Sequence, residues 1–203
     1  MAKLNFTVSN DFDSASAESA RASFAEHLAV CEPNRMFRRS ADPNLISIVR
    51  LIGDVSAWLP LSAAATIFLS TLAKHAGGAT WEWLRSLFKR KDVKPLADVT
   101  TALAVLANKA DGQFEIAIGL DIPDDHFGTT LSIRSRDQQE IARRLAIFVK
   151  HSNRLAEIME AEMRAGRTPI GGASVEVLDD GSLLVRWLWR EDGYPQERQR
   201  HIR

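Results

Sequence analysis

Strict alternation of apolar and polar residues marks the clearest strand in the chain. The apolar residues at every second position are Phe114, Ile116, Ile118, Leu120 and Ile122. Because successive side chains on a strand point to opposite faces, this alternation predicts a strand over about 113–122 with one buried face and one exposed face. A sheet with one exposed face is typical of antiparallel pairing.

Shorter alternating runs predict four further strands. They lie at about 3–8, 128–134, 173–178 and 183–190. The last two flank Asp179-Asp180-Gly181, a turn sequence that favours a hairpin.

Apolar residues that recur three and four positions apart predict helices. The longest predicted helix spans about 136–165, with Ile141, Leu145, Phe148 and Leu155 on its buried face. An apolar helical segment is predicted over about 45–90, with a break or kink at Pro60 and a second break at Gly77-Gly78.

The order of these elements indicates an α+β fold with a mostly antiparallel sheet. Helices are grouped in the middle of the chain, and a strand–strand–helix–strand–strand pattern follows, which differs from alternating βα units. A chain of 203 residues can bury one core, so we expect a single domain over 1–203. If the chain divides, the seam falls at 92–95, between a helix-rich half and a strand-rich half. The sequence leaves open whether strand 3–8 joins the later sheet.

One part of the apolar segment is long enough to cross a membrane. Residues 55–73 carry no charge, and about 20 such residues span a bilayer as a helix. Four residues, Ser62, Thr66, Ser70 and Lys74, recur every four positions and form a mildly polar stripe. This stripe and Pro60 favour a core helix, and a membrane-associating or conditionally inserting helix is the alternative.

Composition and charge exclude several classes of protein. The 26 basic and 26 acidic residues balance, so the net charge does not favour nucleic acid as a partner. The single cysteine, Cys31, excludes an intramolecular disulfide and a multi-cysteine metal site. The single cysteine and the lack of a long apolar stretch in the first residues together favour a cytoplasmic location. Arginine outnumbers lysine 19 to 7, a bias typical of bacterial coding sequences.

The sequence contains no recognisable catalytic motif. No GxxxxGK[ST], strand-following GxGxxG or GxSxG occurs, so we predict no catalytic residue and no cofactor site. The only metal candidates are in a turn, at Asp121, Asp124, Asp125 and His126. Asp is also an ordinary turn residue, which favours a simple connection between two strands.

Two groups of side chains are candidates for contact with a partner. A dense basic run could bind an anion or a lipid headgroup, or could simply solubilise a helix end; it consists of Arg85, Lys89, Arg90 and Lys91. Four apolar residues lie off the main stripes of their elements, so some should be exposed: Trp83, Leu87, Leu184 and Leu188.

The sequence therefore favours a non-enzymatic protein–protein interaction module that acts through an exposed apolar or aromatic patch, as a regulator, adaptor or immunity-like inhibitor does. Its expected partner is another protein or a second copy of the chain. One alternative is a membrane-associating protein that uses the apolar helices of 45–90. Another is a small enzyme or metal-binding protein that uses the turn Asp121–His126.

Overall fold

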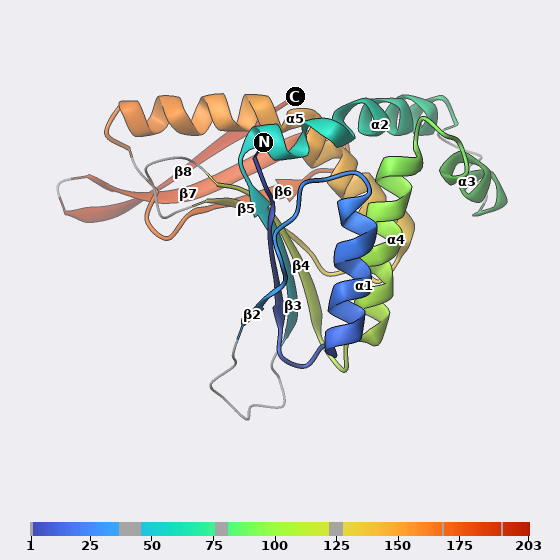
Figure 1. Ribbon diagram of the computed structural model, residues 1–203. Helices are drawn as coiled ribbons and strands as arrows, with labels where there is room; N and C mark the ends of the chain where they lie inside the picture. Colours follow the sequence, from blue (N-terminus) through green and yellow to red (C-terminus); the bar gives the residue numbers. More distant parts are fainter. Residues whose placement is uncertain (1, 37–45, 76–80, 122–127, 168, 192) are drawn as a thin grey trace.

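The computed structural model describes residues 2–36, 46–75, 81–121, 128–167, 169–191 and 193–203, which contain five helices and eight strands (Figure 1). The helices are α1 (Ser14–Ala25), α2 (Val55–Lys74), α3 (Trp81–Phe88), α4 (Lys94–Lys109) and α5 (Gln138–Arg164). The strands are β1 (Asn5–Ser9), β2 (Asn34–Met36), β3 (Ser47–Gly53), β4 (Phe114–Leu120), β5 (Thr129–Ile133), β6 (Ala173–Val177), β7 (Leu183–Glu191) and β8 (Tyr194–Ile202).

The described strands form one mixed sheet in the order β2-β1-β3-β4-β5-β6-β7-β8. Four of its seven pairings are antiparallel, which confirms the predicted α+β class. The first strand does join the later sheet, because β1 pairs with β3 and β3 pairs with β4 along seven residue pairs. The sheet twists so far that β1–β4 run steeply in Figure 1 whereas β6–β8 run almost horizontally.

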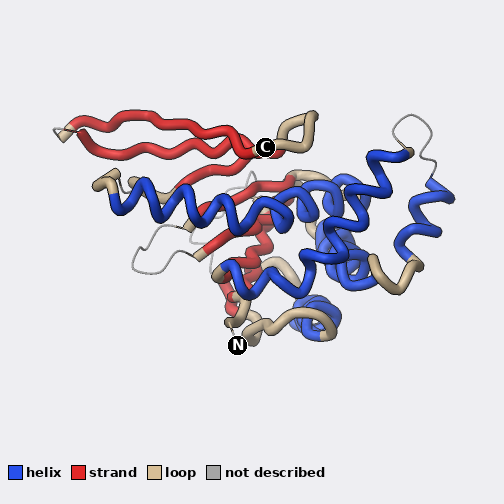
Figure 2. The backbone as a smooth tube through the Cα atoms, turned by 90° about the horizontal axis from the view of Figure 1, so that it is seen from above, coloured by secondary structure: helices blue, strands red, loops and turns tan. Residues whose placement is uncertain are grey.

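The two faces of the sheet differ sharply in composition. One row across six strands is buried and apolar: Phe6, Leu51, Ile118, Leu131, Val175 and Val185. The neighbouring row points to the opposite face: Asn5, Ile52, Gly119, Thr130, Ser174, Arg186 and Gln199. The helices lie on the apolar side (Figures 1 and 2). Among the described elements, no helix packs on the polar face.

The helix layer is joined to the sheet by two aromatic side chains. Trp58 of α2 packs edge-on against Phe148 of α5, with ring centroids 5.9 Å apart. The Trp58 indole N–H donates a hydrogen bond to the carbonyl of Gly119 on β4, at 3.2 Å. On α5, Ile141, Leu145 and Leu155 are fully buried, as predicted.

The prediction of helix from residue 45 is wrong over 47–53, which form β3. Val49 and Leu51 face the core, whereas Ile48, Arg50 and Ile52 face away, so the segment has the two-residue period of a strand. Helix α2 begins only after Asp54, whose side chain accepts a hydrogen bond from the Ala57 N–H at 3.1 Å. The helix then continues through Pro60, where a break or kink was expected.

Helix α2 is packed on one side only. It is the one described helix that is long and apolar enough to cross a membrane, and 33% of its most apolar window is buried. The buried side consists of Ala57, Trp58, Leu61, Ala64, Ala65 and Phe68. On the opposite side Leu59 is 52% exposed. The expected core helix therefore packs against the core along one side and exposes the other side to solvent.

Strand β8, which the sequence did not predict, is held to α5 by a buried carboxylate. The side chain of Glu162 is only 6% exposed and lies 2.5 Å from Arg167, 3.3 Å from Arg198 and 3.2 Å from Arg200. Burial tends to raise the pKa of Glu162, but the hydrogen bonds from Arg167 and Arg200 and the charge of Arg198 outweigh it and hold the pKa below its ordinary value. The carboxylate therefore stays charged and ties the edge of the sheet to the helix layer.

We predict that Phe148→Ala destabilises the protein by about 3–5 kcal/mol, because the ring is fully buried and its loss leaves a cavity beside Trp58. Arg144→Ala is the control on the same helix. Its guanidinium is about a third exposed and pairs with Glu140, so the loss of folding stability should stay below about 1 kcal/mol. Urea titration measures both values, and equal losses would contradict the assigned buried face.

We predict that Glu162→Gln costs about 2 kcal/mol at neutral pH, since it removes a buried charge while its arginine partners can rehydrate in part. The folded pKa is lowered, so the carboxylate stabilises the fold fully above its ordinary pKa of 4.5 and loses this effect as pH falls through the folded pKa. The stability difference between wild type and variant should therefore shrink below about pH 4.5. A stability difference between wild type and variant that stays constant from pH 7 to pH 3 would contradict the stabilising role assigned to the Glu162 carboxylate.

Candidate functional site

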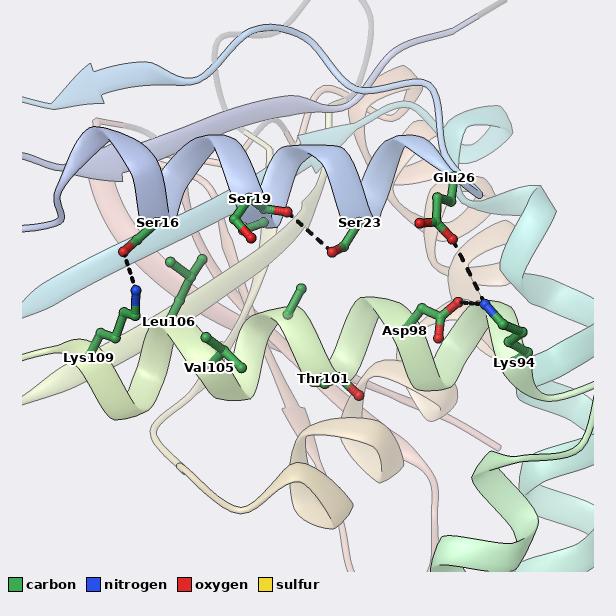
Figure 3. Close-up of a pocket in the computed structure, with 12 residues that line it drawn as sticks. Ser16, Ser19, Ser23, Glu26, Lys94, Asp98, Thr101, Val105, Leu106 and Lys109 are labelled. Atoms are coloured by element: carbon green, nitrogen blue, oxygen red, sulfur yellow. Dashed lines mark hydrogen bonds and ion pairs between the residues drawn. The ribbon is translucent and has the colours of Figure 1, made fainter.

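A groove about 290 Å³ in volume lies between helices α1 and α4, which run antiparallel (Figure 3). Its α1 side presents small polar residues, Ser16, Ser19 and Ser23, and its α4 side presents Val105, which is 50% exposed. At one end the Lys109 ammonium donates a hydrogen bond to the Ser16 hydroxyl, at 2.6 Å. The groove is a lightly polar channel closed by charged groups at its ends.

The other end of this groove holds a cluster with metal-ligand chemistry. The ligand atoms of Glu26, His27 and Asp98 all lie within 4.8 Å of one another, and the His27 Nε2 is 2.8 Å from the Asp98 carboxylate. The Lys94 ammonium, however, donates to the same Asp98 oxygen and lies 3.8 Å from Glu26. It therefore supplies the positive charge that a cation would bring.

Asp98 is the centre of this ion-pair cluster. Partial burial tends to raise its pKa, but hydrogen bonds from Lys94 and His27 outweigh that effect and lower the pKa below the ordinary value. Helices α1 and α4 are thus linked by a network of charges that is already compensated.

A second candidate site is a hollow on the polar face of the sheet. It is open, about 450 Å³ in volume, and lies over β5, β6 and β7. Its floor is rich in hydroxyl groups and glycine, with Thr130, Ser132, Ser174, Gly171 and Gly172 among the lining residues. Two aliphatic side chains also line it and project into solvent.

These two side chains are Ile170, 39% exposed, and Leu188, 47% exposed. The Ile170 N–H donates to the Leu188 carbonyl at 2.7 Å, which places the two residues side by side. The backbone that follows Ile170 is fixed by Gly172: its φ is +95°, and a Cβ there would lie 2.8 Å from the Gly128 carbonyl. The exposed pair is therefore held on a rigid surface.

The rim of the hollow carries charges of opposite sign. Arg186 pairs with Glu176 on the neighbouring strand at 2.9 Å. Glu197 on β8 faces Leu188 across the strands and is exposed. Within the described part of the chain, Glu197 has no ion-pair partner, so the rim offers one uncompensated carboxylate beside the aliphatic pair.

The four apolar residues that were predicted as partner contacts differ in their exposure to solvent. Leu188 is exposed, and Trp83 is partly exposed and stacks on His75 with ring centroids 4.4 Å apart. Leu87 and Leu184 are only 2% and 6% exposed, so neither is available to a partner. Leu87 lies three residues after the buried Leu84 and thus on the same face of α3. Leu184 lies between Glu176 and His201 of the adjacent strands.

The other predicted residues belong to the basic run after α3 and to the turn that follows β4. Arg85, Lys89, Arg90 and Lys91 are all exposed in the last turn of α3 or just after it. Asp92 binds the Arg90 guanidinium through two hydrogen bonds of 2.6 and 3.1 Å, so Arg90 is neutralised locally. Of the predicted turn, Asp121 is exposed, and Asp124, Asp125 and His126 lie outside the described residues.

Sequence reasoning missed Ile170, the second member of the exposed pair. It follows Pro169 and precedes two glycines, so it belongs to no periodic pattern. A single aliphatic residue in a turn-forming segment carries only a weak signal, and its position beside Leu188 comes from the hydrogen bond to β7.

We predict that Zn²⁺ leaves the melting temperature of the wild-type protein unchanged, because Lys94 already compensates the Glu26–His27–Asp98 cluster. An ion at a hundred times its dissociation constant would stabilise the fold by about 2.7 kcal/mol, which is a melting shift of roughly 5–10 °C for this size. Differential scanning fluorimetry measures the shift. A rise of that size that disappears in His27→Gln would contradict this account.

The groove and the hollow lie on different elements and differ in their chemistry. Ion pairs fill one end of the groove, whereas the hollow exposes two aliphatic side chains and a carboxylate on a rigid sheet. No protein-family model matches this chain, and no curated protein or solved structure matches it either.

Proposed function

We propose that this chain is a non-enzymatic protein-binding module whose docking surface is the hollow around Ile170 and Leu188. One observation carries the proposal: two adjacent aliphatic side chains, 39% and 47% exposed, stand on a sheet face that no described helix covers. Exposed aliphatic residues that cluster on a rigid surface mark interaction sites more often than single ones do.

The chemistry of the hollow defines the partner. Its volume suits one large apolar side chain as an anchor, packed against Ile170 and Leu188. The hydroxyl groups of Thr130, Ser132 and Ser174 can bond polar backbone groups around that anchor. Glu197 favours a basic residue at the rim of the partner's surface.

The test begins with the protein that co-purifies with the chain at native expression level. That partner is then purified and titrated against the chain by calorimetry. Leu188→Asp should raise the Kd about 30-fold, equivalent to about 2 kcal/mol, because it places a charge against the apolar anchor. Ile170→Asp should act in the same direction.

Val105→Asp is the matched control, since Val105 is 50% exposed on α4, away from the sheet. It should leave the Kd unchanged. Equal weakening by Val105→Asp, or no weakening by Leu188→Asp, would contradict the assigned surface. If the partner is a second copy of the chain, sedimentation should show a dimer that Leu188→Asp dissociates.

A further inference from the structure

Two side chains of opposite charge flank the aliphatic pair on the open face of the sheet. Glu197 lies directly opposite Leu188 in the β7–β8 pairing, and Arg190 follows Leu188 by two residues on β7. Residues that are opposite each other in an antiparallel pair, and residues two apart on one strand, point to the same face. The two charges therefore share one surface with Leu188 and with Ile170, which lines the same hollow.

These two charges are not compensated within the described chain. Arg190 and Glu197 are both exposed, and neither forms an ion pair with another residue that the structure describes. A further pair on this surface, Arg186 with Glu176, is closed at 2.9 Å. The surface thus offers one free cation and one free anion beside its aliphatic side chains, and its net charge is zero.

The free charges define what a matching surface must contain. It needs apolar side chains against the aliphatic pair, a cation that faces Glu197 and an anion that faces Arg190. A second copy of the same surface supplies all three. In a two-fold contact each residue meets its counterpart reciprocally, so one cation and one anion on each copy make two ion pairs.

The strand register gives these groups the spacing that such a contact requires. Neighbouring strands lie about 4.8 Å apart, and residues two apart on one strand lie about 6.6 Å apart, so Glu197 and Arg190 lie at about those distances from Leu188. A two-fold axis in the plane of the interface that exchanges their positions passes within about 2 Å of Leu188. Leu188 then packs against the partner subunit's Leu188.

The packing of two such faces is sterically open. Sheets that pack face to face lie about 10 Å apart, a distance that an arginine and a glutamate side chain together can span. The same axis makes the strands of the two copies cross at a steep angle, close to the orthogonal arrangement of packed sheets. The described helices lie on the other side of the sheet, so none of them stands between the copies (Figures 1 and 2).

We propose that this surface binds the same surface of a second copy, so that the chain forms a two-fold dimer. Ile170 and Leu188 form its apolar centre, and Glu197 of each copy pairs with Arg190 of the partner subunit. The inference rests on the proposed function, because it names the partner of that protein-binding surface. Two aliphatic side chains per copy and two exposed ion pairs make a weak dimer, with a Kd above about 10 μM. At low micromolar concentration the chain is therefore free.

The test is sedimentation of the full chain at concentrations up to about 0.3 mM, where the wild type should show a concentration-dependent dimer. Arg190→Glu places two carboxylates opposite each other twice in the dimer, and Glu197→Arg does the same with two guanidinium groups. Each variant alone should associate at least about tenfold more weakly than the wild type. Leu188→Asp should abolish the dimer.

An equimolar mixture of the two charge variants is the decisive measurement. In a mixed dimer each carboxylate of the Arg190→Glu chain faces a guanidinium of the Glu197→Arg chain. With one variant fluorescently labelled, the mixture should therefore associate about as tightly as the wild type. An ion pair within one chain cannot produce this rescue, since neither variant has both signs of charge at these positions.

Arg154→Glu and Glu157→Arg are the matched controls. They make the same charge changes at an exposed ion pair of α5, away from the open face of the sheet. Each should dimerise like the wild type, and mixing them should add nothing. Circular dichroism confirms that every variant is folded.

Three results would overturn the proposed dimer. They are a wild type that stays monomeric over the whole concentration range, a dimer that Leu188→Asp leaves intact, and charge variants that fail to associate when mixed. If the wild type is monomeric but Leu188→Asp weakens binding to a different protein, the binding surface is correct and only the second copy is wrong as its partner. If Leu188→Asp weakens neither contact, the proposed function fails as well.

Discussion

The contact between Trp58 and its two neighbours determines how the helix layer sits on the sheet. The indole packs against Phe148 of α5 and donates to the Gly119 carbonyl of β4, so a single side chain joins two helices and a central strand. A buried tryptophan with a satisfied N–H is both a large apolar contact and a directional one. It fixes which side of α2 is buried, and the opposite, uncharged side must then face outward.

A second constraint follows because all five helices that the structure describes lie on one face of the sheet. The apolar row of the sheet is buried beneath the helices. The edge strand β8 is linked to the same helix layer by the ion pairs of Arg198 and Arg200 with Glu162. The other face keeps its polar and small residues and gains Ile170 and Leu188 as exposed aliphatic neighbours. The proposed protein-binding surface thus exists because the helices cover the opposite face of the sheet.

Periodicity predicted the elements that bury a regular apolar face, such as β4 and α5. It failed for β3, whose short alternation runs directly into the apolar helix α2, and for β8, whose inward positions hold Arg198 and Arg200 in place of apolar residues. At the candidate surface it identified Leu188 but also two leucines that are buried by neighbouring elements. Burial at such positions depends on tertiary contacts that a one-dimensional pattern does not contain.

Hydroxyl-radical footprinting of the free protein tests most directly whether the polar face of the sheet is open. The method oxidises exposed aliphatic side chains, and the sheet offers an internal comparison on a single strand. We expect rapid oxidation of Leu188 and Ile170 and near-background oxidation of Leu184 and Val185. Protection of Leu188 and Ile170 at the level of Val185 would contradict the account, because it would mean that another part of the assembly covers this face.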